Sequence, residues 1–185
     1  PQWLPGKHGP RGALAELTGL KIKAGGKPVN WTRDPVDVYA FHIDVPAGVK
    51  EVEAEFQFLS PIRESEGRIV MTPTMMNIQW EQVALYPAGH FTRAIKVTPS
   101  VLLPAGWTGV AALDGAKVSG NRIDYATTSF ENLVDSPMFA GKHFRNWDLG
   151  NKVTLNVVAD EAKNLEAKPE QIAAHPTSLT GQFLS

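Results

Sequence analysis

The chain contains no cysteine. Disulfides, thiolate zinc sites and cysteine nucleophiles are therefore all excluded. No apolar run approaches the roughly 20 residues that a membrane-spanning helix requires, and no charged-then-apolar signal segment opens the sequence. We therefore expect no membrane span. The lack of cysteine leaves the compartment open, because many exported proteins also lack it.

An excess of either charge is also missing. The 185 residues include 18 basic and 19 acidic residues that are mixed along the chain, for a net charge of -1. No basic patch is available for phosphates, so we expect no nucleic-acid partner. An apolar fraction of 43% and a charged fraction of 20% are typical of a folded domain and exclude wholesale disorder.

Motifs of catalysis are missing as well. No histidine belongs to a His-Glu-x-x-His pair, no serine lies in a Gly-x-Ser-x-Gly turn, and the glycines form no phosphate loop. The acidic residues Glu51, Glu53 and Glu55 share one face of a predicted strand, which is typical of a solvated face. We predict no catalytic residue and no metal ligand in this chain, so a self-contained hydrolase is the weakest of the alternatives.

What the sequence does contain is short apolar runs separated by proline and glycine, the pattern of turns in a β protein. Side chains alternate between apolar and polar over 51–58, and similarly over 36–45, which predicts two strands with one buried face each. Gly25-Gly26 predicts one hairpin and Gly120-Asn121, within 117–125, predicts another. Further strands are predicted at 68–71, 76–86, 91–97, 107–113 and 152–158.

Helix is predicted only near the end of the chain. Ser129 is a suitable N-cap for a short helix near 128–135, and Pro169 with Glu170 favours a second helix start near 169. We therefore predict a mainly β fold, a β-sandwich or twisted antiparallel sheets, over residues 1–165. Residues 166–185 would begin a linker or helix.

Two amides stand out as candidates for binding. Asn77 and Gln79 are two positions apart, on the same face of an otherwise apolar predicted strand, and paired amides can hydrogen-bond a peptide backbone. The more ordinary role of such amides is to satisfy the backbone of a bulge or loop. The five tryptophans could form a sugar-binding platform, although large aromatic side chains more often belong to the core.

Several phrases together resemble one family. They are PQWLPGKHGP at 1–10, WTRDPVDVYAF at 31–41, LYPAG at 85–89, LVDSPMFAG at 133–141, and VVAD at 157–160 followed by KPEQ at 168–171. In this order and spacing they are similar to the N-terminal β domain of the glycyl aminopeptidase family of zinc metallopeptidases. The resemblance covers nearly the whole chain.

The resemblance implies a non-catalytic domain that supports a helical zinc domain and contributes to the rim of its substrate site. The parent protein would be a zinc metalloaminopeptidase that removes small N-terminal residues. Gln79 would help to hold the substrate's amino end, with Asn77 beside it and Tyr86 on the rim. Zinc would belong to the catalytic domain, and the partners would be that domain and a peptide substrate.

The resemblance also implies export, typically to the bacterial periplasm, whereas composition leaves the cytoplasm open. The family has additional strands before the Trp-x-Pro-Gly phrase, so we expect part of the β domain to be supplied outside this sequence. No His-Glu-x-x-His motif occurs within these 185 residues, so no zinc ligand can be assigned. The alternative is a free-standing β-sandwich that binds carbohydrate or protein.

Overall fold

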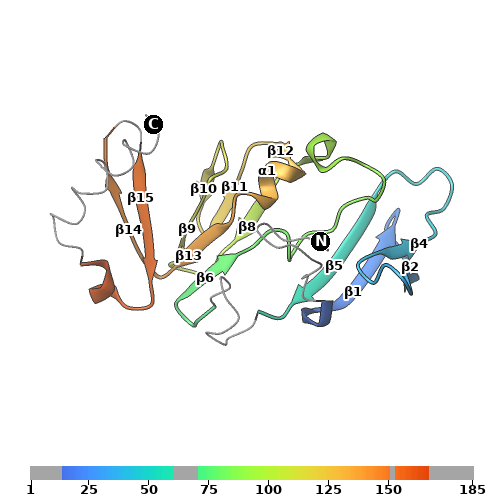
Figure 1. The fold of residues 1–185 in the computed structure, drawn as a ribbon, viewed down its shortest axis with the longest axis horizontal. Helices are drawn as coiled ribbons and strands as arrows, with labels where there is room; N and C mark the ends of the chain where they lie inside the picture. The colour runs from blue at the N-terminus through green and yellow to red at the C-terminus, as the bar shows by residue number, and fades with distance from the viewer. Residues whose placement is uncertain (1–13, 61–70, 151–152, 167–185) are drawn as a thin grey trace.

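The computed structural model describes residues 14–60, 71–150 and 153–166. Within them the chain is mainly β, every strand pair is antiparallel, and the predicted fold class is confirmed. Figure 1 shows an elongated molecule, with an N-terminal sheet at one end, short sheets in the middle and one hairpin at the other end. No described helix has the length and apolar character needed to cross a bilayer.

The N-terminal sheet has the strand order β2-β1-β5, and a short 3-10 helix, η1, precedes it. Its elements are η1 (Leu14–Glu16), β1 (Leu17–Ala24), β2 (Lys27–Val29) and β5 (Val52–Phe58). Gly25 and Gly26 join β1 to β2 with φ angles of 56° and 78°, which only glycine adopts without strain, so the predicted hairpin is confirmed. On β5 the acidic face is exposed, and Lys23 of β1 pairs with Glu53 at 3.7 Å.

A separate hairpin joins β3 (Trp31–Arg33) to β4 (Phe41–Ile43). The strand predicted from residue 36 is therefore wrong before Phe41. The side chain of Asp34 accepts hydrogen bonds from the backbone N–H groups of Val36 and Asp37, each at 2.8 Å. These bonds fix a loop in which Val36 is 90% exposed, because an aspartate carboxylate competes with strand pairing for the nearby backbone.

The middle of the molecule combines three small sheets, with orders β6-β13-β9, β10-β11-β8 and β12-β7. Their strands are β6 (Met75–Ile78), β7 (Lys96–Val97), β8 (Ser100–Leu102), β9 (Thr108–Ala111), β10 (Lys117–Ser119), β11 (Arg122–Asp124), β12 (Thr128–Ser129) and β13 (Met138–Gly141). The predicted hairpin at Gly120-Asn121 is confirmed as β10 and β11. The strand predicted over 91–97 is largely replaced by a 3-10 helix, η3 (Thr92–Ala94), before β7.

The short helix predicted near 128–135 is confirmed as α1 (Phe130–Val134). Ser129 caps it, because its hydroxyl accepts a hydrogen bond from the N–H of Asn132 at 3.1 Å. Phe130 and Leu133 face inward and are buried. Pro137 follows, and because proline has no N–H group it could not donate the backbone hydrogen bond of a further helical turn.

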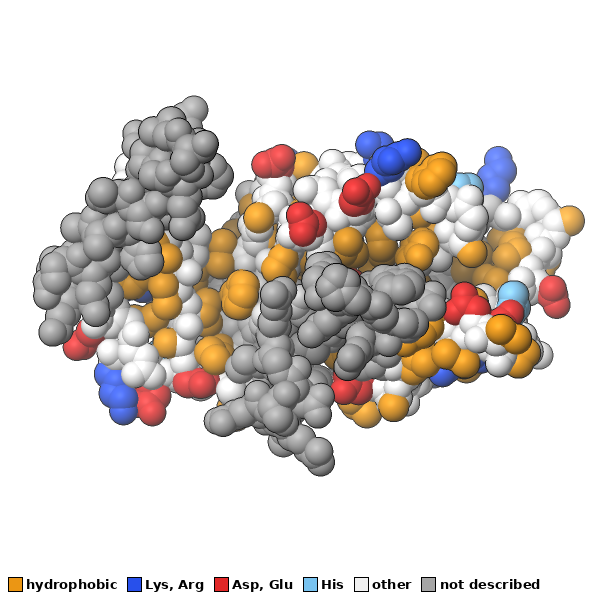
Figure 2. Space-filling model, in the orientation of Figure 1, with side chains coloured by type: hydrophobic (Ala, Val, Ile, Leu, Met, Phe, Trp, Pro, Cys, Tyr) orange, Lys and Arg blue, Asp and Glu red, His pale blue; other side chains and the backbone are white. Residues whose placement is uncertain are grey.

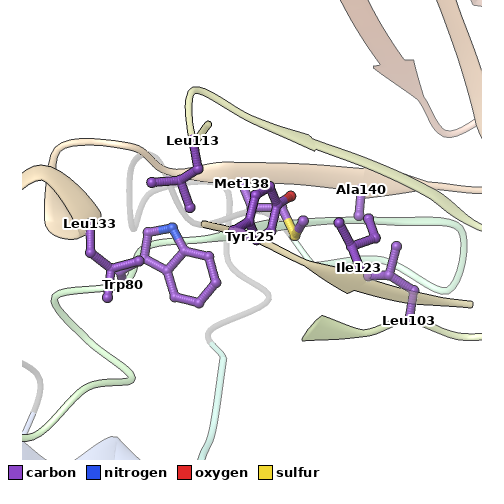
Figure 3. Close-up of a cluster of buried hydrophobic side chains, with 8 residues drawn as sticks. All are labelled: Trp80, Leu103, Leu113, Ile123, Tyr125, Leu133, Met138 and Ala140. Carbon is purple, nitrogen blue, oxygen red and sulfur yellow. The ribbon is translucent and has the colours of Figure 1, made fainter. Parts of the chain in front are cut away.

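The main core lies between α1 and the middle sheets. Figure 3 shows the ring of Trp80 beside Leu133 and Leu113, with Met138 further along the cluster. Its buried members are Trp80, Leu103, Leu113, Ile123, Tyr125, Leu133, Met138 and Ala140. Gly109 on β9 lies so close to this cluster that a Cβ there would be 2.9 Å from Leu103 and 3.1 Å from Met138. The sheet can therefore approach the core closely only with glycine at this position.

The last hairpin consists of β14 (His143–Asp148) and β15 (Thr154–Ala159), followed by a 3-10 helix, η4 (Ala162–Leu165). The strand predicted over 152–158 is thus confirmed for most of its length. The predicted helix start near 169 lies outside the described residues, as does the rest of the predicted linker beyond Glu166.

Candidate substrate-binding rim

Asn77 lies on the face of the β6-β13-β9 sheet that points away from the core. Met76 and Ile78 pack against the core cluster, so strand alternation turns the side chain between them the other way. Its cross-strand neighbour on β13 is Phe139, which is 48% exposed. Asn77 itself is half-buried and takes part in a polar interaction.

Gln79 is placed one residue beyond β6, because the strand ends at Ile78. Its carbonyl accepts a hydrogen bond from the N–H of Gln82 at 3.0 Å, and the carbonyl of Trp80 accepts one from Val83 at 3.1 Å. Gln79 therefore begins a tight turn. The expectation that Asn77 and Gln79 share one face of a single strand is wrong, since the backbone leaves the sheet between them.

The turn is fixed on both sides of Gln79. Ile78 is paired with the fully buried Met138, and Trp80 is 8% exposed with its indole N–H donating to the carbonyl of Ser136 at 2.6 Å. Gln79 is half-buried between these two anchors. The backbone of such a turn is held by its neighbours more firmly than that of a free loop.

Tyr86 lies further along the same segment and is 42% exposed. Its ring packs on Phe130, the first residue of α1, with ring centroids 5.0 Å apart. Within the described residues, no hydrogen bond or ring contact joins Tyr86 to Asn77 or Gln79. The three predicted residues thus share one stretch of chain, and the structure places two of them at the end of β6 and the third beside α1.

A recess beside the Gln79 turn was not predicted. It lies where the turn meets the N-terminal sheet and the β3-β4 hairpin, and its space is about 470 Å³, open solvent included. Its lining residues are Leu14, Leu17, Arg33, Tyr39, Phe41, Phe58, Glu81, Gln82, Ala84 and Leu85. Glu81 is only 5% exposed, and its charge within an apolar run, two positions after Gln79, was the one sequence signal that pointed here.

The most perturbed carboxylates lie away from this turn. A hydrogen bond from His42, with two more from backbone N–H groups, lowers the pKa of Asp34 to about 2. Hydrogen bonds from Thr72 and Thr74 likewise keep the pKa of Asp160 below its usual value. Both are half-buried carboxylates that accept several hydrogen bonds, a structural role rather than that of a general base.

The described residues do not fit a zinc centre, because nowhere do three or more His, Asp or Glu side chains cluster closely enough to bind a metal ion. The charges are dispersed too. Figure 2 shows acidic and basic side chains interspersed over the visible face of the described surface.

The four tryptophans within the described residues do not form a common platform, and Trp3 lies outside those residues. Trp80 is buried, and Trp107 packs against the core cluster. Trp31 donates to the carbonyl of Leu20 at 3.0 Å and meets Phe41 edge to face, while Trp147 on β14 stacks under Arg145. Among the described residues, the indoles serve separate packing sites, which weighs against a sugar-binding face.

Comparison with known proteins agrees with this fold. The sequence model of a family described as the peptidase M61 N-terminal domain matches residues 1–142. One similar solved structure is the crystal structure of an aminopeptidase N family protein from Idiomarina loihiensis, with a TM-score of 0.62 and 12% identity. The match covers 84% of this chain and 26% of that one, so this chain spans about a quarter of its length. No curated protein sequence matches significantly.

Proposed function

Because the chain belongs to the family of peptidase M61 N-terminal domains, whose sequence model matches residues 1–142, we propose that it is the non-catalytic β domain of a zinc aminopeptidase of the glycyl aminopeptidase kind. In this role it packs beside a catalytic domain and adds side chains to the rim of the substrate site. The zinc belongs to that other domain, and export to the periplasm is part of the same proposal.

The observation that best supports the rim role is the anchored turn at Gln79. A substrate's terminal ammonium group requires acceptor oxygens at fixed positions, and a side-chain amide supplies one such oxygen. Burial of Trp80 on one side and pairing of Ile78 with Met138 on the other fix the backbone of Gln79. The backbone that carries the amide therefore needs little reordering on binding, which favours affinity.

The neighbouring residues would have lesser roles. Asn77 lies on the outward face of the sheet beside Phe139, where it supports the approach to the turn. Tyr86 packs on Phe130 and keeps part of its ring exposed, as a rim residue requires. Neither is proposed to take part in the chemical step.

The experiment compares the 185-residue chain with the complete parent protein, purified and dialysed in the same way. Zinc content and hydrolysis of a glycyl substrate are measured for both, and cell fractionation locates the parent protein. We expect zinc and activity only in the parent. Near-stoichiometric zinc together with peptidase activity in the 185-residue chain would overturn the non-catalytic assignment.

A further inference from the structure

The recess beside the Gln79 turn has apolar walls supplied by segments distant in sequence. Leu17 of β1 and Phe58 of β5 come from the N-terminal sheet, Phe41 from β4, and Leu85 from the segment after the turn. The recess is a small hollow that is open to solvent, so it suits part of one side chain rather than a folded partner.

Arg33 stands at the wall of this recess with an unusual environment. Its guanidinium carbon lies 5.1 Å from the centroid of the Phe41 ring, which fixes the group over an apolar surface. Within the described residues, no carboxylate lies within ion-pair distance of Arg33, whereas Arg122 is paired with Asp124 at 2.7 Å. An oriented guanidinium without an anion beside an apolar hollow is suited to bind a carboxylate.

Among the described residues that line the recess, the other charged group is Glu81, so its effect on an anion has to be considered. Glu81 is 5% exposed, and both Glu81 and Tyr39 already take part in another interaction. Arg33 is exposed and therefore reaches a ligand at the mouth of the recess. A ligand whose apolar group enters the recess would keep its carboxylate beside Arg33 and away from the buried Glu81.

We propose that this recess binds a carboxylate carried next to an apolar side chain, as found at the C-terminal end of a peptide. Phe41, Phe58 and Leu85 would contact the side chain, and Arg33 would donate hydrogen bonds to the carboxylate. The site is separate from the Gln79 amide, which is proposed to bind the opposite, amino end of a substrate. Its test measures binding only, so it can fail without affecting the proposed function.

The test titrates the 185-residue chain with N-acetylphenylalanine and with its amide, by NMR or calorimetry. We expect the acid to bind with a dissociation constant of about 1 mM, as for a ligand of this size, and roughly 3- to 10-fold more tightly than the amide. The variant Arg33→Gln should remove that difference. Phe58→Ala should weaken both ligands equally.

The matched control is Arg93→Gln. Arg93 lies 4.9 Å from the Phe91 ring in the same kind of stack but is not part of the recess, so its loss should leave binding unchanged. Three results would each overturn the proposal. They are equal binding of the acid and the amide, no binding of either ligand at a concentration 10-fold above the expected dissociation constant (~10 mM), and an unaltered preference for the acid in Arg33→Gln. Two further results would also overturn it. One is tighter binding of 2-phenylethylamine than of N-acetylphenylalanine, which would make Glu81 the determinant. The other is tighter binding of N-acetyl-aspartyl-phenylalaninamide than of N-acetylphenylalanine, because the former presents only a side-chain carboxylate.

Discussion

The indole N–H of Trp80 donates a hydrogen bond to the carbonyl of Ser136 at 2.6 Å, although 56 positions separate the two residues. This bond ties the turn after β6 to the segment between α1 and β13. Ser136 is itself buried, and its hydroxyl donates to the carbonyl of Ala112 at 3.2 Å. The position of Gln79 therefore depends on packing in the middle of the domain rather than on its own segment.

Changing Trp80→Phe should lower the melting temperature. The Ser136 carbonyl would lose its partner while still buried, a loss of about 1–3 kcal/mol in the free energy of unfolding, with a further loss for the smaller ring. Thermal melts by circular dichroism measure it. The control is Trp107→Phe, a half-buried indole with no such hydrogen bond among the described residues, which should destabilise less. Equal losses in the two variants would contradict the role of the bond.

Asp160 should make stability depend on acid pH. Its carboxylate accepts hydrogen bonds from the hydroxyls of Thr72 and Thr74, the latter at 2.9 Å, and these lower its pKa in the folded protein. A carboxyl group whose pKa is lower in the folded than in the unfolded chain stabilises the fold at pH values above its unfolded-state pKa of about 4. This stabilisation is lost as the pH falls through the folded-state pKa. Asp160→Asn should therefore melt lower than wild type at neutral pH, with the difference shrinking below about pH 4.

The control for that series is Asp114→Asn, since Asp114 is an exposed carboxylate outside these contacts. Its melting temperature should follow wild type at each pH. A difference between Asp160→Asn and wild type that stays constant from pH 7 down to about pH 2 would show that the charge of Asp160 is not responsible.

Gly141→Ala should loosen the attachment of the last hairpin. A Cβ at this position would collide with Val158 of β15 and lie 2.9 Å from the carbonyl oxygen of Thr74. Overpacking of this kind costs about 1–3 kcal/mol in the free energy of unfolding. Chemical denaturation measures the loss. The double variant Gly141→Ala/Val158→Ala should recover part of it, because the second change removes the nearest atom, and strictly additive losses would contradict this account.

Much of the fold could be predicted because local sequence specified it. Gly25-Gly26 and Gly120-Asn121 marked their hairpins, and Ser129 marked the start of α1. One error occurred where a side chain competes with strand pairing. At 36–40 the carboxylate of Asp34 binds the backbone that a strand would use, and this competition is not visible in an apolar alternation.

The candidate site could be predicted only as a stretch of chain. The amides Asn77 and Gln79 were found from their polarity within an apolar run. The end of β6 at Ile78, which gives their side chains different orientations, was not predicted. The recess brings Arg33 and Phe58 to the Glu81 segment from sheets far apart in sequence. Such long-range proximity depends on sheet packing, and a single sequence contains no local signal for it.

The most direct test of the account is the steady-state kinetics of Gln79→Ala in the complete parent protein on a glycyl substrate. If the Gln79 amide binds the substrate's ammonium group, its loss removes a hydrogen bond to a charged group and lowers kcat/KM roughly 10- to 150-fold, with an unchanged melting temperature. Gln57→Ala, an exposed amide on β5, should behave as wild type in both measurements. Wild-type kcat/KM in Gln79→Ala together with a clearly lowered melting temperature would show that the amide is only structural, and would contradict the account.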